Sequence, residues 1–146
     1  MTLSDVIQQE PSADTLQLWL KKVPYATFLG IRAEIHENEI LFVLPKDEKL
    51  IGNPSLPALH GGVIGAFMEQ AGAFHLIAKM DNPVLPKIIN FSLDYLRPAR
   101  LQDTYATCRL TRQGRFIANI NIIAWQDNRE QPNALARAHF LIPEDD

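Results

Sequence analysis

The sequence predicts an α+β domain in which one antiparallel sheet of five or six strands curls around a single long helix. Between Gly61 and Met80 only Glu69 and Lys79 carry a full charge, and a helix that is apolar on every side is usually buried. Two strand-like runs precede this stretch and four follow it, with short turns that favour an antiparallel meander. A length of 146 residues suits one domain with a single core.

Composition excludes several classes of function. A net charge of -3 provides no electrostatic footprint for nucleic acid. The long helix could span a membrane by length, but its central glutamate, its glycines and the strands after it argue against that. The four histidines form no metal-ligand pair, so neither a metal nor another cofactor is expected. The single cysteine and the absence of a visible secretory signal fit a cytoplasmic protein.

The first predicted element is a short helix, which Ser12 or Asp14 can cap and Pro24 stops. Its apolar positions follow helical spacing at Leu16, Trp19, Leu20 and Val23. We therefore divide the chain into an N-terminal segment, residues 1–24, and a main domain, residues 25–146.

The main domain opens with two predicted strands, residues 31–36 and 39–44, in which apolar side chains recur. Residues 45–59 contain three prolines and a glycine, so we expect no regular structure there. The segment also carries four large apolar residues, which predicts a packed loop leading to the helix.

Four more strands are predicted after the helix. They span about residues 88–96, 104–111, 116–126 and 133–142. In the first of them Ile89, Phe91, Leu93 and Tyr95 alternate with polar residues and should share one face.

Glu69 is the residue of the helix that most needs an explanation. An unpaired carboxylate in an apolar site costs several kcal/mol or raises its pKa, so a chain that keeps one there usually uses it. The alternative is a structural carboxylate that points at a gap in the packing and accepts hydrogen bonds from backbone amides.

These residues resemble those of a known family. A buried helix that opens with H-G-G, an acid nine residues after the histidine and a following strand that ends in L-R-P-A are similar to the hotdog-fold acyl-CoA thioesterases. The closer resemblance is to the phenylacetic-acid-degradation and Arthrobacter-type 4-hydroxybenzoyl-CoA thioesterase branch. It covers about residues 25–142 and implies the hotdog fold.

The resemblance implies a role for each motif residue. The Gly61 N–H would bind the thioester oxygen, as a free amide at a helix N-terminus can. Gly62 would permit close approach of the backbone, although tight packing alone would also favour both glycines. The side chain of His60 would position the loop rather than transfer protons, and Glu69 would act as nucleophile or as general base for water.

The spacing of these groups has a consequence for assembly. Gly61 and Glu69 lie eight residues apart, about 12 Å along a helix, so one small carbonyl cannot touch both in the same chain. The resemblance likewise implies two antiparallel helices across a homodimer with two shared sites. We therefore expect a dimer to be required, and a dimer of dimers is left open.

Three positions depart from the family pattern. Pro54 stands where the family often has Gln or Asn, and the neighbouring Asn53 is the substitute candidate. Ala73 replaces a Ser or Thr that could hold the attacking water one turn after the acid. Ser55 occupies the place of the catalytic histidine of hotdog dehydratases, which weighs against dehydration.

Coenzyme A carries phosphates, for which arginine is well suited through its planar fork. Arg97 and Arg100 follow the L-R-P strand end, and Arg115 lies in a later turn, so these three are the candidates. Each is also an ordinary solvated turn residue.

The function expected from the sequence is hydrolysis of an acyl-CoA by water with the help of Glu69 and Gly61. The alternatives are a non-catalytic acyl-thioester binding protein and, less favoured, a hotdog dehydratase. The acyl group and the carrier, coenzyme A or acyl carrier protein, stay open.

Overall fold

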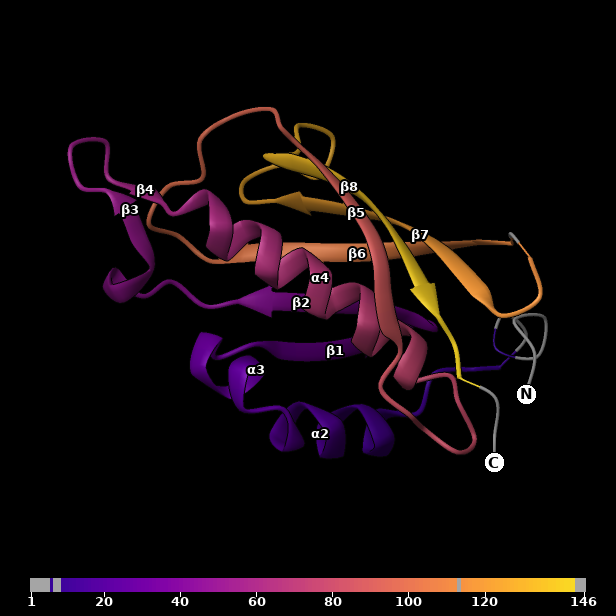
Figure 1. The fold of residues 1–146 in the computed structure, drawn as a ribbon. Coiled ribbons are helices and arrows are strands. Elements are labelled where there is room, and N and C mark those ends of the chain that lie inside the picture. The colour runs from indigo at the N-terminus through magenta and orange to yellow at the C-terminus, as the bar shows by residue number, and fades with distance from the viewer. Residues whose placement is uncertain (1–5, 7–8, 113, 144–146) are drawn as a thin grey trace.

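The computed structural model describes residues 6, 9–112 and 114–143, and its architecture is the predicted α+β fold. One long helix, α4, lies across one face of a six-stranded antiparallel sheet (Figure 1). The helices are α2 (Ala13–Lys22), α3 (Pro24–Leu29) and α4 (Gly61–Ile77), with a 3-10 turn η1 (Glu48–Leu50). The strands are β1 (Arg32–His36), β2 (Glu39–Leu44), β3 (Ile51–Asn53), β4 (Ala58–Leu59), β5 (Lys87–Tyr95), β6 (Thr104–Arg112), β7 (Ile117–Trp125) and β8 (Ala134–Leu141).

The order of the main sheet is β1-β2-β6-β7-β8-β5. The expected meander of four successive strands is therefore wrong at its first step, because β5 pairs with β8 and not with β6. After α4 the chain enters the sheet at its far edge, and the segment between β5 and β6 brings it back beside β2 (Figure 1). One edge of β5 has no neighbouring strand among the described residues.

The N-terminal helix forms as predicted, and Ser12 is its cap, because its side-chain oxygen accepts a hydrogen bond from the Thr15 N–H (3.2 Å). Pro24 ends α2, but it also begins the unpredicted α3, since the fixed φ of proline suits the first position of a helix. Leu16 of α2 is fully buried and α2 packs against α4, so the core draws on both sides of residue 24. The division of the chain at that residue stays a prediction.

Residues 45–59 are more regular than expected. Besides η1 they form a small antiparallel hairpin of β3 and β4, in which Ile51 pairs with Leu59. Pro54 and Pro57 lie in the turn between these strands, where a missing N–H interrupts no ladder. The expected packing holds for Leu50 and Leu59, which are buried, while Leu56 is exposed at the turn.

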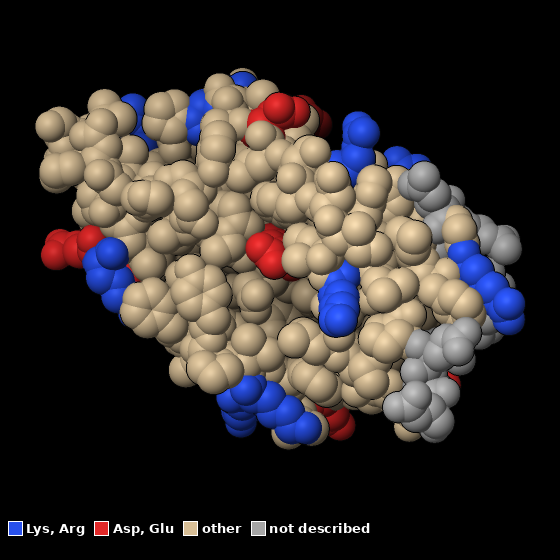
Figure 2. All heavy atoms as spheres, in the orientation of Figure 1, with Lys and Arg blue, Asp and Glu red and all other residues tan. Residues whose placement is uncertain are grey.

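The two halves of α4 differ in their surroundings. Every residue from Ala71 to Ala78 is buried, but the first half has an open side, so the expectation of burial all round holds only for the second half. Half-buried or exposed residues on the first half are Gly61, Gly62, Val63, Gly65, Ala66, Glu69 and Gln70. In Figure 2 the face over α4 is mostly uncharged, and charged groups lie mainly toward its rim.

The inner face of β5 is largely as predicted. Leu93 approaches Gly65, and Tyr95 approaches Gly61, so the helical glycines let this strand come close to α4. The prediction for Ile89 is wrong, because a bulge between Ile88 and Asn90 shifts the register there. Ile89 is 55% exposed as a result.

His75 is the polar exception in the buried half of α4. Its Nδ1 has no hydrogen-bond partner within the described residues. Burial, with a smaller contribution from the positive charge of Lys79, lowers the pKa of His75 from 6.5 to about 3. The folded protein therefore holds this imidazole neutral at every pH where the unfolded chain begins to protonate it.

The difference between the pKa of His75 in the folded and in the unfolded protein predicts that the free energy of unfolding falls on acidification. Between pH 6.5 and 3 the unfolded chain binds the extra proton, so the free energy of unfolding drops by about 1.4 kcal/mol per pH unit in this window. Urea unfolding at fixed protein concentration should give a value about 2 kcal/mol lower at pH 5 than at pH 7 from this group alone. A His75→Leu variant should lack that part of the slope, and an identical slope in both proteins would contradict the assignment.

Candidate functional site

The N-terminus of α4 leaves one backbone amide without an acceptor. A helix has four such amides at its start. Here the His60 N–H bonds to the Leu50 carbonyl (2.8 Å), the Gly62 N–H to His60 Nδ1 (2.9 Å) and the Val63 N–H to the His60 carbonyl (3.0 Å). Among the described residues no acceptor engages the Gly61 N–H, so this group is available to a ligand.

His60 is the N-cap residue of α4. Its Nδ1 accepts a hydrogen bond and therefore carries no proton, which leaves the proton of the neutral ring on Nε2. The β3–β4 hairpin packs closely against His60, because a Cβ on Gly52 would lie only 2.7 Å from the His60 Cα. Glycine at position 52 thus allows β3 to approach the cap closely.

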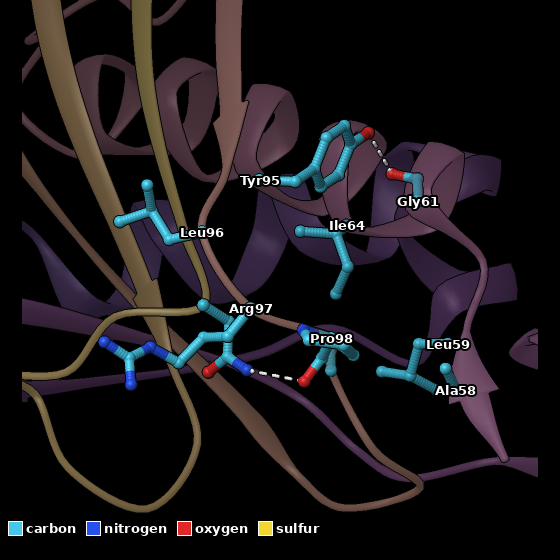
Figure 3. A pocket seen from close by; sticks show the side chains of 10 residues that line it. Ala58, Leu59, Gly61, Ile64, Tyr95, Leu96, Arg97 and Pro98 are labelled. Atoms are coloured by element: carbon cyan, nitrogen blue, oxygen red, sulfur yellow. Dashed lines mark hydrogen bonds between the residues drawn. The ribbon is translucent and has the colours of Figure 1, made fainter. Parts of the chain in front are cut away.

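The Gly61 carbonyl has a side-chain partner. The Tyr95 hydroxyl, at the end of β5, donates a hydrogen bond of 2.6 Å to it (Figure 3). Both residues line a cavity of about 350 Å³ whose wall is mostly apolar. The other lining residues are Ala58, Leu59, Ile64, Leu96, Arg97, Pro98, Ala99 and Asn133. The free amide therefore lies beside an apolar cavity.

A second, more polar cavity of about 260 Å³ lies on the other side of the Arg97–Pro98 segment. Arg97, Pro98 and Asn133 line both cavities, and Arg100 lines the second. The Arg97 Nε donates to the Pro132 carbonyl (3.2 Å), and no bond is formed by the exposed Arg100 guanidinium to any described residue. The polar cavity next to the apolar one is thus lined by two arginines and by one carboxylate, that of Asp127.

Two buried or half-buried amides fix the segment that carries these arginines. The Gln126 side chain accepts from the Arg100 N–H (3.0 Å) and donates to the Arg100 carbonyl (2.9 Å). Asn133 donates from its side chain to the Pro98 carbonyl (3.1 Å), and its own carbonyl accepts from Leu96 (2.8 Å). The loop after β5 therefore has a defined shape.

The turn between β7 and β8, which forms the far wall of the polar cavity, is fixed by Arg129. Its guanidinium makes two hydrogen bonds to the Glu39 carboxylate (2.8 and 3.1 Å) and one to the Thr107 hydroxyl (3.1 Å). It also lies over the ring of Trp125. The hydrogen bonds from Arg129 lower the pKa of the Glu39 carboxyl below its ordinary value.

Glu69 lies on the partly open side of α4 and is half-buried rather than enclosed. It follows Gly61 by eight residues of one continuous helix, about 12 Å along the axis. Ala73, one turn later, is buried and offers no hydroxyl. Within one chain, therefore, the carboxylate and the free amide cannot contact the same carbonyl.

The remaining predicted residues lie apart from this amide. The side-chain oxygen of Asn53 accepts from the Ser55 N–H (3.0 Å) and so stabilises the turn of the β3–β4 hairpin. Arg115, whose guanidinium lies over the Phe116 ring, sits in the β6–β7 turn at the opposite end of the sheet from Arg97 and Arg100 (Figure 1). It could join their site only through a second subunit.

The described part of the chain contains neither a metal-ligand cluster nor a helix suited to a membrane. No group of three or more His, Cys, Asp and Glu side chains is placed to hold a metal ion. No described helix combines the length and apolar character needed to cross a membrane.

Sequence reasoning missed three residues of the site. Tyr95 looked like one more apolar residue of a strand face, and Gln126 and Asn133 looked like strand ends. Their partners are 34, 26 and 35 residues away in the chain. No local spacing could reveal these contacts, although the L-R-P-A segment contains Pro98, whose carbonyl accepts from Asn133.

Comparisons with known proteins identify a family and structural relatives of this chain. A sequence profile described as the thioesterase superfamily matches residues 56–133. No curated protein sequence matches the chain. A crystal structure of a Chromobacterium violaceum protein is 41% identical, with coverage of 92% of this chain and 97% of that chain and a TM-score of 0.72.

More distant solved structures share the fold. The E. coli PaaI protein, from the phenylacetic acid degradation operon, is 17% identical over 90% of this chain and 92% of its own, with a TM-score of 0.75. A Bacillus halodurans protein crystallised with CoA is 17% identical over 99% of this chain and 92% of its own, with a TM-score of 0.73.

Proposed function

Because the chain belongs to the thioesterase superfamily, we propose that it hydrolyses an acyl-CoA to the free acid and coenzyme A. Its single long helix against six antiparallel strands is the hotdog fold that the sequence resemblance implied. The proposal concerns the substrate and the residues that act on it.

The observation that carries the proposal is the free Gly61 N–H at the start of α4, beside an apolar cavity. Attack on a thioester places negative charge on the carbonyl oxygen. A fixed amide donor at the positive end of a helix stabilises that charge as it develops. The neighbouring apolar wall would exclude water from the bond to this oxygen.

Glu69 would supply the second half of the chemistry. As general base its carboxylate accepts a proton from water while the water oxygen attacks the carbonyl carbon, and the thiolate of coenzyme A leaves. As nucleophile the carboxylate attacks directly, and water then hydrolyses the resulting anhydride. Both routes need the carboxylate and the Gly61 N–H on one carbonyl, so each site would combine groups from two subunits.

Two features support a second copy of this chain as the partner. The nine-residue strand β5 lies at a sheet edge, and such an edge is a ready site for strand pairing. The open side of α4, which carries Glu69, lies next to this edge because β5 packs against Gly61 and Gly65. A two-fold dimer through β5 would cover both surfaces and create two equal sites.

The polar cavity supports coenzyme A as the carrier. It adjoins the apolar cavity through Arg97, and Arg100 lies on its wall. The phosphates of coenzyme A would bind these guanidinium groups, and its pantetheine arm would lie in the apolar cavity toward Gly61. The CoA in the Bacillus halodurans structure is consistent with a carrier of this kind on this fold.

The direct test is thiol release from a panel of acyl-CoAs with short, aryl and long acyl groups. Turnover of at least one substrate, with saturation, would support the proposal. Tight binding of acyl-CoAs without any turnover would favour the alternative, a non-catalytic acyl-thioester binding protein.

A Glu69→Gln variant should lose activity and keep its fold. Removing a catalytic base or nucleophile lowers turnover by at least about 100-fold. The half-buried position of Glu69 makes the isosteric change tolerable for packing. The measurement is kcat on the best acyl-CoA, with circular dichroism and thermal melting as controls for folding. More than about a tenth of wild-type kcat would show that Glu69 is not catalytic.

Whether coenzyme A is the carrier can be tested with the same acyl group attached to coenzyme A and to pantetheine. Arg100→Ala should raise KM for the acyl-CoA by about 10-fold and leave KM for the acyl-pantetheine, which lacks the nucleotide phosphates, unchanged. Arg32→Ala, at an exposed arginine on the other edge strand β1, is the matched control and should change neither. Equal effects of Arg100→Ala on both substrates would contradict the assignment of the polar cavity to phosphate.

A further inference from the structure

The peptide unit between Gly61 and Gly62 is held at both of its polar ends. Its carbonyl oxygen accepts from the Tyr95 hydroxyl (2.6 Å), and its N–H donates to His60 Nδ1 (2.9 Å). The two side chains come from different parts of the fold, the end of β5 and the N-cap of α4. Together they fix the positions of both the carbonyl oxygen and the N–H of this peptide.

The same side chains also explain why two glycines stand here. A Cβ on Gly61 would lie 3.2 Å from both Cζ and the hydroxyl oxygen of Tyr95. A Cβ on Gly62 would lie 2.9 Å from His60 Nδ1. Each holding side chain therefore occupies the space next to its glycine that a larger residue would need.

Two consecutive glycines would otherwise be a poor support for a catalytic amide, because glycine restricts φ and ψ less than any other residue. The Gly61 N–H belongs to the preceding peptide, and its direction depends on the torsions of Gly61. Fixing the following peptide from both ends limits those torsions. The hydrogen bonds thus replace the steric restriction that a side chain would supply.

We propose that Tyr95 is a positioning residue which, together with His60, holds the Gly61–Gly62 peptide and so orients the free Gly61 N–H toward the thioester carbonyl. The inference rests on the proposed function for its chemical role. The Tyr95 hydroxyl donates its hydrogen bond to the Gly61 carbonyl, so we assign it no role in proton transfer. A donor fixed before the reaction needs no reorganisation as charge develops on the oxygen.

The first experiment compares Tyr95→Phe with the wild type on the best acyl-CoA. Loss of the hydroxyl removes one hydrogen bond and keeps the ring, so kcat should fall by about 3- to 10-fold while KM changes less than about twofold. Tyr105→Phe is the matched control, because Tyr105 lies on β6, its ring packs near that of Trp125, and it does not line the apolar cavity beside Gly61. It should leave both parameters unchanged.

A double-variant cycle tests whether both side chains act on the same peptide. His60→Phe removes the Nδ1 acceptor and keeps a ring against Gly52. If the loss of either hydrogen bond alone is enough to release the Gly61–Gly62 peptide, adding Tyr95→Phe to His60→Phe should lower kcat by less than about twofold further. Independent contributions would multiply, and that result would contradict a shared peptide.

A readout without substrate separates this inference from the proposed function. In Tyr95→Phe the backbone amide order parameters of Gly61 and Gly62 should fall, while that of Gly72 in the buried half of α4 should not change. Unchanged order at both glycines would overturn the inference, even in a protein with no thioesterase activity. If the wild type is active, a Tyr95→Phe variant that keeps full kcat, whether or not its KM changes, would overturn the inference as well.

Discussion

The capping of α4 by His60 is the constraint on which the site depends. A helix start offers four amides, and three of them are occupied by carbonyl oxygens and by the His60 ring. The fourth, the Gly61 N–H, is left beside an apolar cavity. Gly52 lets the β3–β4 hairpin support the cap, and Tyr95 joins it to β5. Hairpin, helix and sheet edge therefore converge on one donor.

The rigid geometry of the helix also determines what one chain cannot do alone. Gly61 and Glu69 are about 12 Å apart on one axis, so the proposed chemistry needs a second subunit. The single chain has surfaces that fit this need: an edge strand, the open side of α4 and exposed apolar residues such as Ile89 and Tyr95. Folding, assembly and catalysis would then share the same interface.

The sequence predicted the features that depend on local pattern. A run almost free of charge located α4, and alternating apolar residues located most of the strands. The H-G-G and L-R-P-A motifs lie in two segments that meet at the apolar cavity. It failed where distant residues decide the structure. Pairing of β5 with β8, the hairpin within residues 45–59 and the bulge at Ile89 all depend on tertiary partners. The reason for two successive glycines became visible only with Tyr95 and His60 in place.

The most direct test of the shared site is complementation between two inactive chains. Glu69→Gln removes the carboxylate, and Gly61→Pro removes the amide at the first helical position. The helix backbone accepts proline there, but the Tyr95 ring must shift because a Cβ on Gly61 would lie 3.2 Å from it. Random re-pairing makes about half of the dimers mixed, each with one intact site, so activity should recover to about a quarter of the wild type. Both variants must fold and exchange subunits. If they do, and the mixture stays inactive, the shared-site account is wrong.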